Sequence, residues 1–170
     1  MLELQLLRHA KSDWGRPELA DRDRDLAPRG IKAAAAMGGE IRRRRLVPDL
    51  VLCSSAVRAR RTWELAVAEL ERPPALKLLA TLYLASPRTM LEIVHRQKDV
   101  QRLMLVGHDP GMHELANALI GKGAAEDVAA VAAKYPTGAL AVFRFAAERW
   151  ADVAPGGGEL VLFLRPRDLD

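Results

Sequence analysis

The sequence predicts an α/β fold, a single three-layer α/β/α domain with a mainly parallel central sheet. Strand-like apolar runs alternate with helical patterns along most of the chain, and this alternation is typical of parallel sheets covered by helices. A chain of 170 residues is also long enough to bury one core, and we see no linker or internal repeat. We therefore expect one domain over residues 1–170.

The first half of the chain contains three strand-like runs. Leu2, Leu4 and Leu6 alternate with polar neighbours, so the first run has the period of two of a strand, and it stops at Arg8. The second run is a short apolar stretch bounded by turn residues, as in a strand covered on both faces. In order, we expect a strand over residues 2–8, a loop over 12–25, a helix over 28–45, a strand over 48–55, a helix over 56–71 and a strand-like stretch over 76–85.

The second half repeats this plan and then changes. A helix over residues 87–97 begins with proline at a first-turn position. An apolar strand over 103–106 then ends in polar residues before a helix over 112–120. Two strand-like runs, 138–146 and 158–166, flank a glycine-rich stretch and predict two final strands joined by a turn, antiparallel at one edge of the sheet.

Polar residues follow three of these strands at the point where each strand ends. Arg8 and His9 follow the first strand, the segment from Ser54 to Arg58 follows the second, and His108 follows the strand over 103–106. In sheets of this kind, ligands bind beyond the carboxyl ends of the strands. We therefore expect these side chains to meet in one crevice.

Two arginines and two histidines in one cleft would form a compact cationic pocket. Guanidinium groups carry forked donors that suit phosphoryl oxygens, and phosphoryl transfer mainly requires positioning and stabilisation of charge. A side-chain nucleophile can divide hydrolysis into two displacements. From the residues alone, either His9 or His108 could be that nucleophile.

Three segments in order resemble the signatures of the histidine phosphatase superfamily, and in particular its small SixA-type phosphohistidine phosphatase branch. They are LLRHAKSDW, PDLVLCSSAVRARRT and LVGHDPGM, and the segments DLAPRG, LYLAS, PTGALAVF and RPRDL are similar to that branch in order and spacing. The resemblance covers nearly all of the chain and implies a phosphoglycerate mutase-like fold. It also implies four catalytic residues: His9 would take the phosphoryl group, while Arg8, Arg58 and His108 would bind its oxygens.

One departure from the family pattern bears on the substrate. Larger members of the superfamily carry a carboxylic acid that protonates the leaving oxygen, but the corresponding stretch LYLASPRT has no Asp or Glu. This favours phosphohistidine, because its weak P–N bond releases imidazole with less help from a positioned acid. Asp13 in the first loop is an open candidate for an acid. Asp25 and Asp109 stand where the branch often has proline and asparagine, and both could alter substrate fit.

Composition and motifs exclude several other classes. The net charge of +4 fits an anionic ligand, but the run Arg42–Arg45 has no interleaved aromatic residues, so we expect no nucleic-acid partner. No apolar run approaches the roughly 20 residues needed to span a membrane. The phosphate loop G-x-x-x-x-G-K-[ST] is missing. A single cysteine and the lack of a secretion signal predict a cytoplasmic protein.

The remaining histidines and the cysteine favour structural roles. His108 and His113 are five residues apart and do not share a helix face, so we expect no metal and no other cofactor. His95 and His113 are expected to be structural. Cys53 and Arg58 are separated by four residues, one fewer than in the loop of cysteine phosphatases, and Cys53 fits a small apolar strand residue.

These observations predict a metal-independent phosphatase that hydrolyses phosphohistidine through a covalent phosphohistidine enzyme intermediate. The partner would be a phosphohistidine-containing protein, such as a phosphorelay component, or a small phosphorylated substrate. Two alternatives stay open: a small-molecule phosphomonoesterase on the same pocket, and a module that binds phosphate or a phosphoprotein without turnover. The sequence predicts neither the cognate phosphoprotein nor the oligomeric state.

Overall fold

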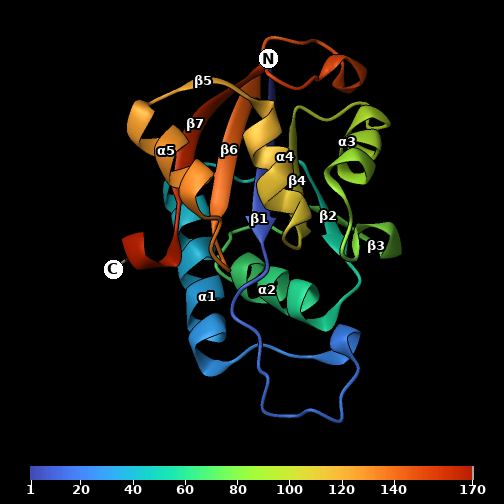
Figure 1. Ribbon diagram of the computed structural model, residues 1–170, viewed down its shortest axis with the longest axis vertical. Helices are drawn as coiled ribbons and strands as arrows, with labels where there is room; N and C mark the ends of the chain where they lie inside the picture. The colour runs from blue at the N-terminus through green and yellow to red at the C-terminus, as the bar shows by residue number, and fades with distance from the viewer. Residues whose placement is uncertain (170) are drawn as a thin grey trace.

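The computed structural model describes residues 1–169 and contains one seven-stranded sheet flanked by helices (Figure 1). The strand order is β3-β2-β4-β1-β6-β7-β5. The strands are β1 (Leu2–Arg8), β2 (Leu50–Ser54), β3 (Ala75–Leu79), β4 (Arg102–Gly107), β5 (Ile120–Gly123), β6 (Leu140–Phe145) and β7 (Gly158–Leu164). The helices are α1 (Pro28–Arg43), α2 (Val57–Val67), α3 (Pro87–His95), α4 (Gly111–Leu119) and α5 (Ala125–Ala133).

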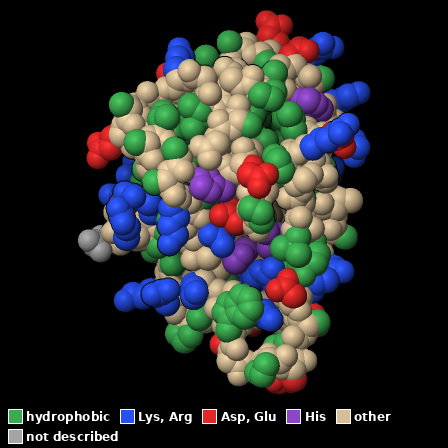
Figure 2. Space-filling model, in the orientation of Figure 1, with side chains coloured by type: hydrophobic (Ala, Val, Ile, Leu, Met, Phe, Trp, Pro, Cys, Tyr) green, Lys and Arg blue, Asp and Glu red, His purple; other side chains and the backbone are tan. Residues whose placement is uncertain are grey.

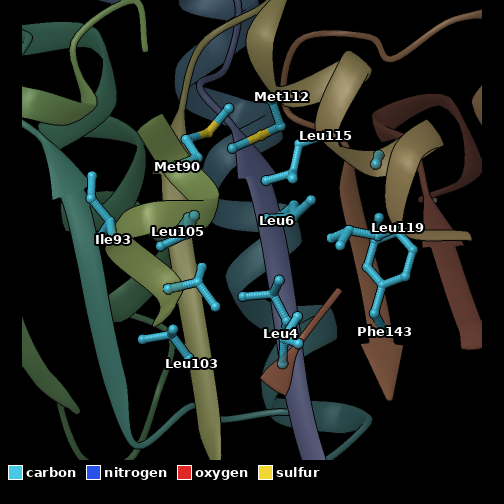
Figure 3. Close-up of a cluster of buried hydrophobic side chains, with 14 of the residues drawn as sticks. Leu4, Leu6, Met90, Ile93, Leu103, Leu105, Met112, Leu115, Leu119 and Phe143 are labelled. Atoms are coloured by element: carbon cyan, nitrogen blue, oxygen red, sulfur yellow. The ribbon is translucent and has the colours of Figure 1, made fainter. Parts of the chain in front are cut away.

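Helices cover both faces of the sheet, which confirms the three-layer prediction. On one face, Met37 of α1 and Trp63 of α2 pack with Leu7 of β1 in one buried cluster. On the other face, residues of α3 and α4 gather around Leu4 and Leu6 of the same strand (Figure 3), and Val131 of α5 belongs to the same buried cluster. Because β1 is buried from both sides, its carboxyl end is held firmly.

The strand directions confirm the mainly parallel sheet. β1 pairs in parallel with β4, β2 pairs in parallel with β3 and β4, and β5 pairs in parallel with β7. Only β6 runs against the other strands of residues 1–169, since it pairs antiparallel with both β1 and β7. The expected antiparallel arrangement is therefore correct in direction but not in position: β6 lies inside the sheet, and β5 forms the edge beyond β7.

Two elements were missed by the sequence analysis, α5 and β5. Helix α5 (AEDVAAVAA) buries only Val131, so it lacks the apolar periodicity that identifies amphipathic helices. Its alanine content and the acidic residues of its first turn are the signals that favour a helix. Strand β5 (IGKG) contains two glycines, which are usually depleted in strands. Gly121 is required there, because a Cβ atom would lie 2.1 Å from the Gly156 carbonyl oxygen.

Two predicted boundaries also differ from the structure. Helix α2 ends at Val67 rather than near Glu71, and tighter turn hydrogen bonds continue to Leu70, ahead of the two prolines that follow. The strand-like stretch over 76–85 is divided between β3 and a 3₁₀ turn at Ala80–Leu82. None of the helices within residues 1–169 is long and apolar enough to cross a membrane.

Candidate active site

Three neighbouring strands bring the predicted site residues to one edge of the sheet. Strands β2, β4 and β1 are adjacent and parallel, and Arg8 of β1 lies opposite Gly107 of β4. His9 directly follows β1 and His108 directly follows β4. Arg58 lies in the first turn of α2, which follows β2. The structure therefore brings Arg8, His9, Arg58 and His108 together, and we refer to them as the four-residue site. Figure 2 shows histidine side chains in the middle of this face, among Lys and Arg side chains.

The His9 ring has a defined orientation and protonation. Its Nδ1 atom lies 2.8 Å from the carbonyl oxygen of Ala10. A carbonyl oxygen only accepts, so Nδ1 carries the proton and Nε2 keeps its lone pair. The pKa of His9 is lowered to about 3, mainly by burial and in smaller part by the nearby charges of His108, Arg58 and Arg8. The ring is therefore a neutral imidazole at pH 7.

A clamp of backbone hydrogen bonds holds the segment that carries His9. The His9 N–H donates to the Gly107 carbonyl at 3.0 Å, and the Gly138 N–H donates to the carbonyls of Arg8 and His9 at 3.1 and 2.8 Å. Gly138 has a φ of +79°, and a Cβ atom there would lie 3.0 Å from Pro166 Cγ. This position needs glycine on both counts.

His108 faces His9 across the site. The two ring centroids are 5.2 Å apart, and His108 Nε2 lies 2.7 Å from the hydroxyl oxygen of Ser54. The edge of the Tyr83 ring packs against His108, with centroids 5.5 Å apart. Burial, followed by the charge of Arg58, lowers the pKa of His108 to about 4. Its Nδ1 atom is buried and has no hydrogen-bond partner within residues 1–169.

Arg58 is buried and is held by a carboxylate. Its guanidinium group donates to the main-chain oxygen of Asp21 at 2.7 Å and to the Asp21 carboxylate at 3.0 Å. The Tyr83 hydroxyl donates to the same carboxylate oxygen, and this bond, with the contacts of Arg58, lowers the pKa of Asp21. Asp21 is therefore ionised at neutral pH and orients Arg58, which makes it a poor proton donor.

Arg8 is fixed by groups from the other side of the site. Its Nη1 atom donates to the Tyr135 carbonyl at 2.8 Å and lies 3.4 Å from the Asp109 carboxylate. Burial lowers the pKa of Arg8, and the Asp109 charge opposes that effect. The Arg8 Nε atom is buried and has no partner within residues 1–169. The site thus combines two fixed guanidinium groups with two neutral imidazoles, a set suited to a tetrahedral oxyanion.

The comparisons with known proteins agree with this geometry. Residues 4–79 match the model of the histidine phosphatase superfamily, branch 1. An uncharacterised protein of Mycobacterium tuberculosis is 42% identical over 95% of this chain and 100% of its own. A crystal structure from Agrobacterium tumefaciens, assigned as a phosphohistidine phosphatase SixA, is 32% identical, with a TM-score of 0.83 over 97% of this chain and 98% of its own.

The chain belongs to the histidine phosphatase superfamily. Within it the chain is of the SixA type, with a phosphoglycerate mutase-like fold, and it is a phosphatase. A further SixA structure, in complex with tungstate, has the same fold, with a TM-score of 0.75 and 18% identity over 99% of this chain and 100% of its own.

Sequence reasoning missed several residues that position the site of this histidine phosphatase. Thr62 accepts the Ala10 N–H at 2.9 Å and donates to the Arg58 carbonyl at 2.7 Å, so one buried hydroxyl joins the His9 segment to α2. Its spacing of four from Arg58, in the same signature, was an available signal. Asp21 and Tyr83 carried none, because their contact joins segments 62 residues apart.

The residues assigned to structural roles are all engaged by the protein. His95 Nε2 contacts the Val153 carbonyl, and His113 Nε2 contacts the Val131 carbonyl. Cys53 is fully buried on β2, and burial raises the pKa of its thiol to about 12, which is unsuited to a nucleophile. Within residues 1–169, no three His, Cys, Asp or Glu side chains are grouped to hold a metal ion.

Asp13, the candidate acid, and Asp109, a residue expected to alter substrate fit, occupy different settings. Asp13 is exposed, and its carboxylate accepts the Gly15 N–H at 2.8 Å. Within residues 1–169 it makes no hydrogen bond or ion pair with the four-residue site. Asp109 is partly buried next to Arg8, and burial raises the pKa of its carboxyl group. Of the two, Asp109 is therefore the carboxylate nearer to the chemistry.

Proposed function

We propose that this protein hydrolyses phosphohistidine in a protein substrate, without a metal, through a phosphoryl group carried on His9. The observation that carries the proposal is the orientation of the His9 ring. Its Nδ1 proton is committed to the Ala10 carbonyl, so Nε2 is a neutral nucleophile inside a frame of two guanidinium groups. His108 has no such carbonyl contact and takes a different role.

The reaction divides into two displacements at phosphorus. In the first, the Nε2 lone pair of His9 bonds to phosphorus as the P–N bond of the substrate breaks and its electron pair returns to the substrate imidazole. When the other ring nitrogen of the substrate carries a proton, the leaving group departs as neutral imidazole and needs no acid from the protein. In the second, water attacks phosphorus as the P–Nε2 bond breaks, and the electron pair of that bond returns to His9 Nε2. Phosphate leaves with the oxygen of water, whose surplus proton passes to solvent.

The other three residues hold the transferred phosphoryl group. Arg8 and Arg58 are fixed on opposite sides of the site and donate to its oxygens as negative charge moves across them. When the Ser54 hydroxyl donates to His108 Nε2, the proton of that ring lies on Nδ1, the buried atom without a protein partner. We assign this N–H to a phosphoryl oxygen. A neutral His108 also has no extra proton to pass to Nε2 of His9, so the nucleophile keeps its lone pair.

A second candidate function is hydrolysis of a small phosphomonoester. The specific observation in its favour is Asp109, a carboxyl group with a raised pKa beside Arg8, which could protonate an alkoxide leaving group. Its ion pair with Arg8 opposes that role, because the positive charge stabilises the ionised carboxylate. We therefore rank phosphohistidine first.

The test compares two substrates in the presence of EDTA. We expect phosphate release from a histidine-phosphorylated protein to exceed that from p-nitrophenyl phosphate by orders of magnitude in kcat/KM. Equal or greater activity on the ester, lost in Asp109→Asn, would support the second candidate. Loss of activity on chelation would exclude the metal-free mechanism.

A further inference from the structure

A wide groove lies beside the four-residue site, and its lining is basic. Its volume is about 700 Å³. It is formed by the end of β1, the first half of α1, the segment after α5 and the C-terminal segment. We call it the basic groove; its charged lining residues are Arg8, Lys11, Arg29, Lys32, Lys134, Arg165 and Arg167. Figure 2 shows Lys and Arg side chains gathered on the left of the face that carries the histidines.

The charge of the basic groove is concentrated and largely unpaired. Seven of the 26 Lys and Arg residues line it and no Asp or Glu does, so the rest of the chain carries 19 basic against 22 acidic residues. The lining therefore carries a formal charge of +7 and the rest of the chain −3, although Arg8 and Arg165 are paired with Asp109 and Asp168, which lie outside the lining. Within residues 1–169, the lining cations that make no ion pair or side-chain hydrogen bond are Lys11, Arg29, Lys32, Lys134 and Arg167.

The basic groove opens onto the phosphoryl site. Arg8 belongs to both, and Lys11 lies two residues after His9. On the other side, Pro166 of the groove packs against Gly138, which holds the backbone of His9. A molecule whose phosphoryl group reaches His9 therefore has its neighbouring part beside these cations.

The chemistry of the lining favours an acidic peptide segment over other anions. Lys32, Lys134, Arg29 and Arg167 are exposed and make no ion pair or side-chain hydrogen bond within residues 1–169, unlike the held donors of Arg8 and Arg58. Long, exposed cations without a protein partner suit the varied spacing of Asp and Glu side chains on a protein, and they steer encounter through the field they create. No aromatic residue lines the groove for bases to stack on, which disfavours nucleic acid.

We propose that the basic groove binds an acidic segment of the phosphoprotein substrate close to its phosphohistidine. The proposal rests on the proposed function, since it assumes a protein that presents its phosphoryl group to His9. It adds a specificity rule: the enzyme selects phosphohistidine with acidic neighbours. The four-residue site supplies the chemistry for any phosphohistidine, and the basic groove selects among them.

The test uses two synthetic phosphohistidine peptides that differ only near the phosphorylated residue. One carries four Asp or Glu residues, and the other has Asn or Gln at the same positions. At low ionic strength we expect kcat/KM to be about 10-fold higher for the acidic peptide, and this preference should shrink as salt rises from about 0.05 to 0.5 M. The charge reversal Lys32→Glu with Lys134→Glu should abolish the preference, with a much larger loss of kcat/KM for the acidic peptide than for the neutral one.

The matched control reverses two exposed cations elsewhere. Arg72→Glu with Lys98→Glu changes the net charge by the same amount. These two residues precede β3 and β4, so they lie towards the amino ends of the parallel strands, whereas the site lies at the carboxyl ends. This control should keep the full preference for the acidic peptide. An equal loss in both double variants would overturn the proposal, because it would show that net charge and not the groove is responsible.

A binding measurement separates this proposal from the proposed function. The acidic peptide without its phosphoryl group, carrying a fluorophore, should bind the wild-type protein by anisotropy about 10-fold more tightly than the Lys32→Glu, Lys134→Glu variant. Turnover of both peptides at equal rates would overturn the groove proposal and leave the proposed function standing. Groove-dependent binding without turnover of either peptide would do the reverse. Preference for tripolyphosphate or an oligonucleotide over the peptide would also overturn the groove proposal.

Discussion

The four-residue site and the basic groove are adjacent, share Arg8, and are built in opposite ways. In the site, each functional group is tied to protein, and His9, His108 and Arg58 are also buried: the contacts are His9 to the Ala10 carbonyl, His108 to Ser54, and Arg58 to Asp21. In the groove, most cations are exposed and have no partner within residues 1–169. The side chains of the site are therefore ordered by protein contacts when the chain folds, whereas most cations of the groove lack such contacts.

This difference separates chemistry from recognition. Groups that stabilise charge during a reaction must be oriented in advance, because reorganisation at the moment of reaction costs rate. Groups that attract a charged partner act over several ångströms and tolerate motion. We therefore expect substitutions in the site, Arg8 included, to reduce turnover of every substrate, and substitutions of the other groove cations to act mainly on the choice among substrates.

The largest effect is expected for His9→Ala. This variant removes the nucleophile, so turnover should fall to the uncatalysed level and no acid-labile phosphoenzyme should form. The measurements are phosphate release and retention of labelled phosphate on the protein after rapid quenching. His95→Ala, at a histidine whose Nε2 contacts the Val153 carbonyl and which makes no hydrogen bond to the four-residue site within residues 1–169, serves as the control and should retain activity. A fully active His9→Ala would remove the assignment.

A smaller but still large effect is expected for Arg58→Lys. Lysine keeps the charge but cannot donate from two nitrogens to Asp21 and still face a phosphoryl oxygen. We expect kcat/KM to fall about 10²- to 10³-fold on all substrates. Arg61→Lys, on the same helix and 35% exposed, should change it less than about 2-fold. Comparable losses in both variants would mean that helix stability, not phosphate contact, is measured.

A moderate effect is expected for Thr62→Val, which keeps the shape of the side chain and removes its hydroxyl. The buried Ala10 N–H then has no acceptor, which costs about 1–3 kcal/mol of stability. The His9 segment and Arg58 also lose their common anchor, so turnover should fall roughly 10-fold. Urea unfolding and steady-state rates measure the two effects. Thr89→Val, at a partly buried position of α3 remote from His9 in sequence, is the control; an active, equally stable Thr62→Val would show that the anchor is dispensable.

The smallest effect at neutral pH concerns proton binding. His9 and His108 have pKa values of about 3 and 4 in the folded protein, whereas an unfolded histidine has a pKa of about 6.5. Below pH 6.5 the unfolded chain therefore binds protons that the folded chain does not, and stability falls as the pH falls towards 4. Urea unfolding at pH 7, 6 and 5 should show this decline, with a shallower slope in His9→Gln. Equal stability at all three values would contradict the buried neutral imidazoles.

The sequence predicted the parts of the site that depend on local pattern. Arg8, His9 and His108 interrupt apolar runs at strand ends, and that signal needs no knowledge of distant contacts. The residues that hold the site in place gave no such signal, because the contact between Asp21 and Tyr83 joins segments that only the fold brings together. The residues alone leave His9 and His108 as alternative nucleophiles, and our proposal for His9 rests on its contact with the Ala10 carbonyl, which only the coordinates supply.

The basic groove was hidden from sequence reasoning for a similar reason. Its cations come from four segments, residues 8–11, 29–36, 134–137 and 165–169, and none of these contains a conspicuous basic run. The run that is conspicuous, Arg42–Arg45, proved less informative: Arg43 and Arg44 pair with Glu40 on their own helix. Local charge density therefore said little about where unpaired charge collects.

The clamp at Gly138 has a consequence for how the enzyme is made. All four residues of the site are translated before Gly138, yet the loop bearing the nucleophile is held by that glycine and by the hairpin of β6 and β7 beyond it. A nascent chain thus carries the complete set of reactive groups without the template that aligns them. Catalytic competence should appear only once the last fifth of the polypeptide has left the ribosome, and a chain stopped at residue 137 should release no phosphate.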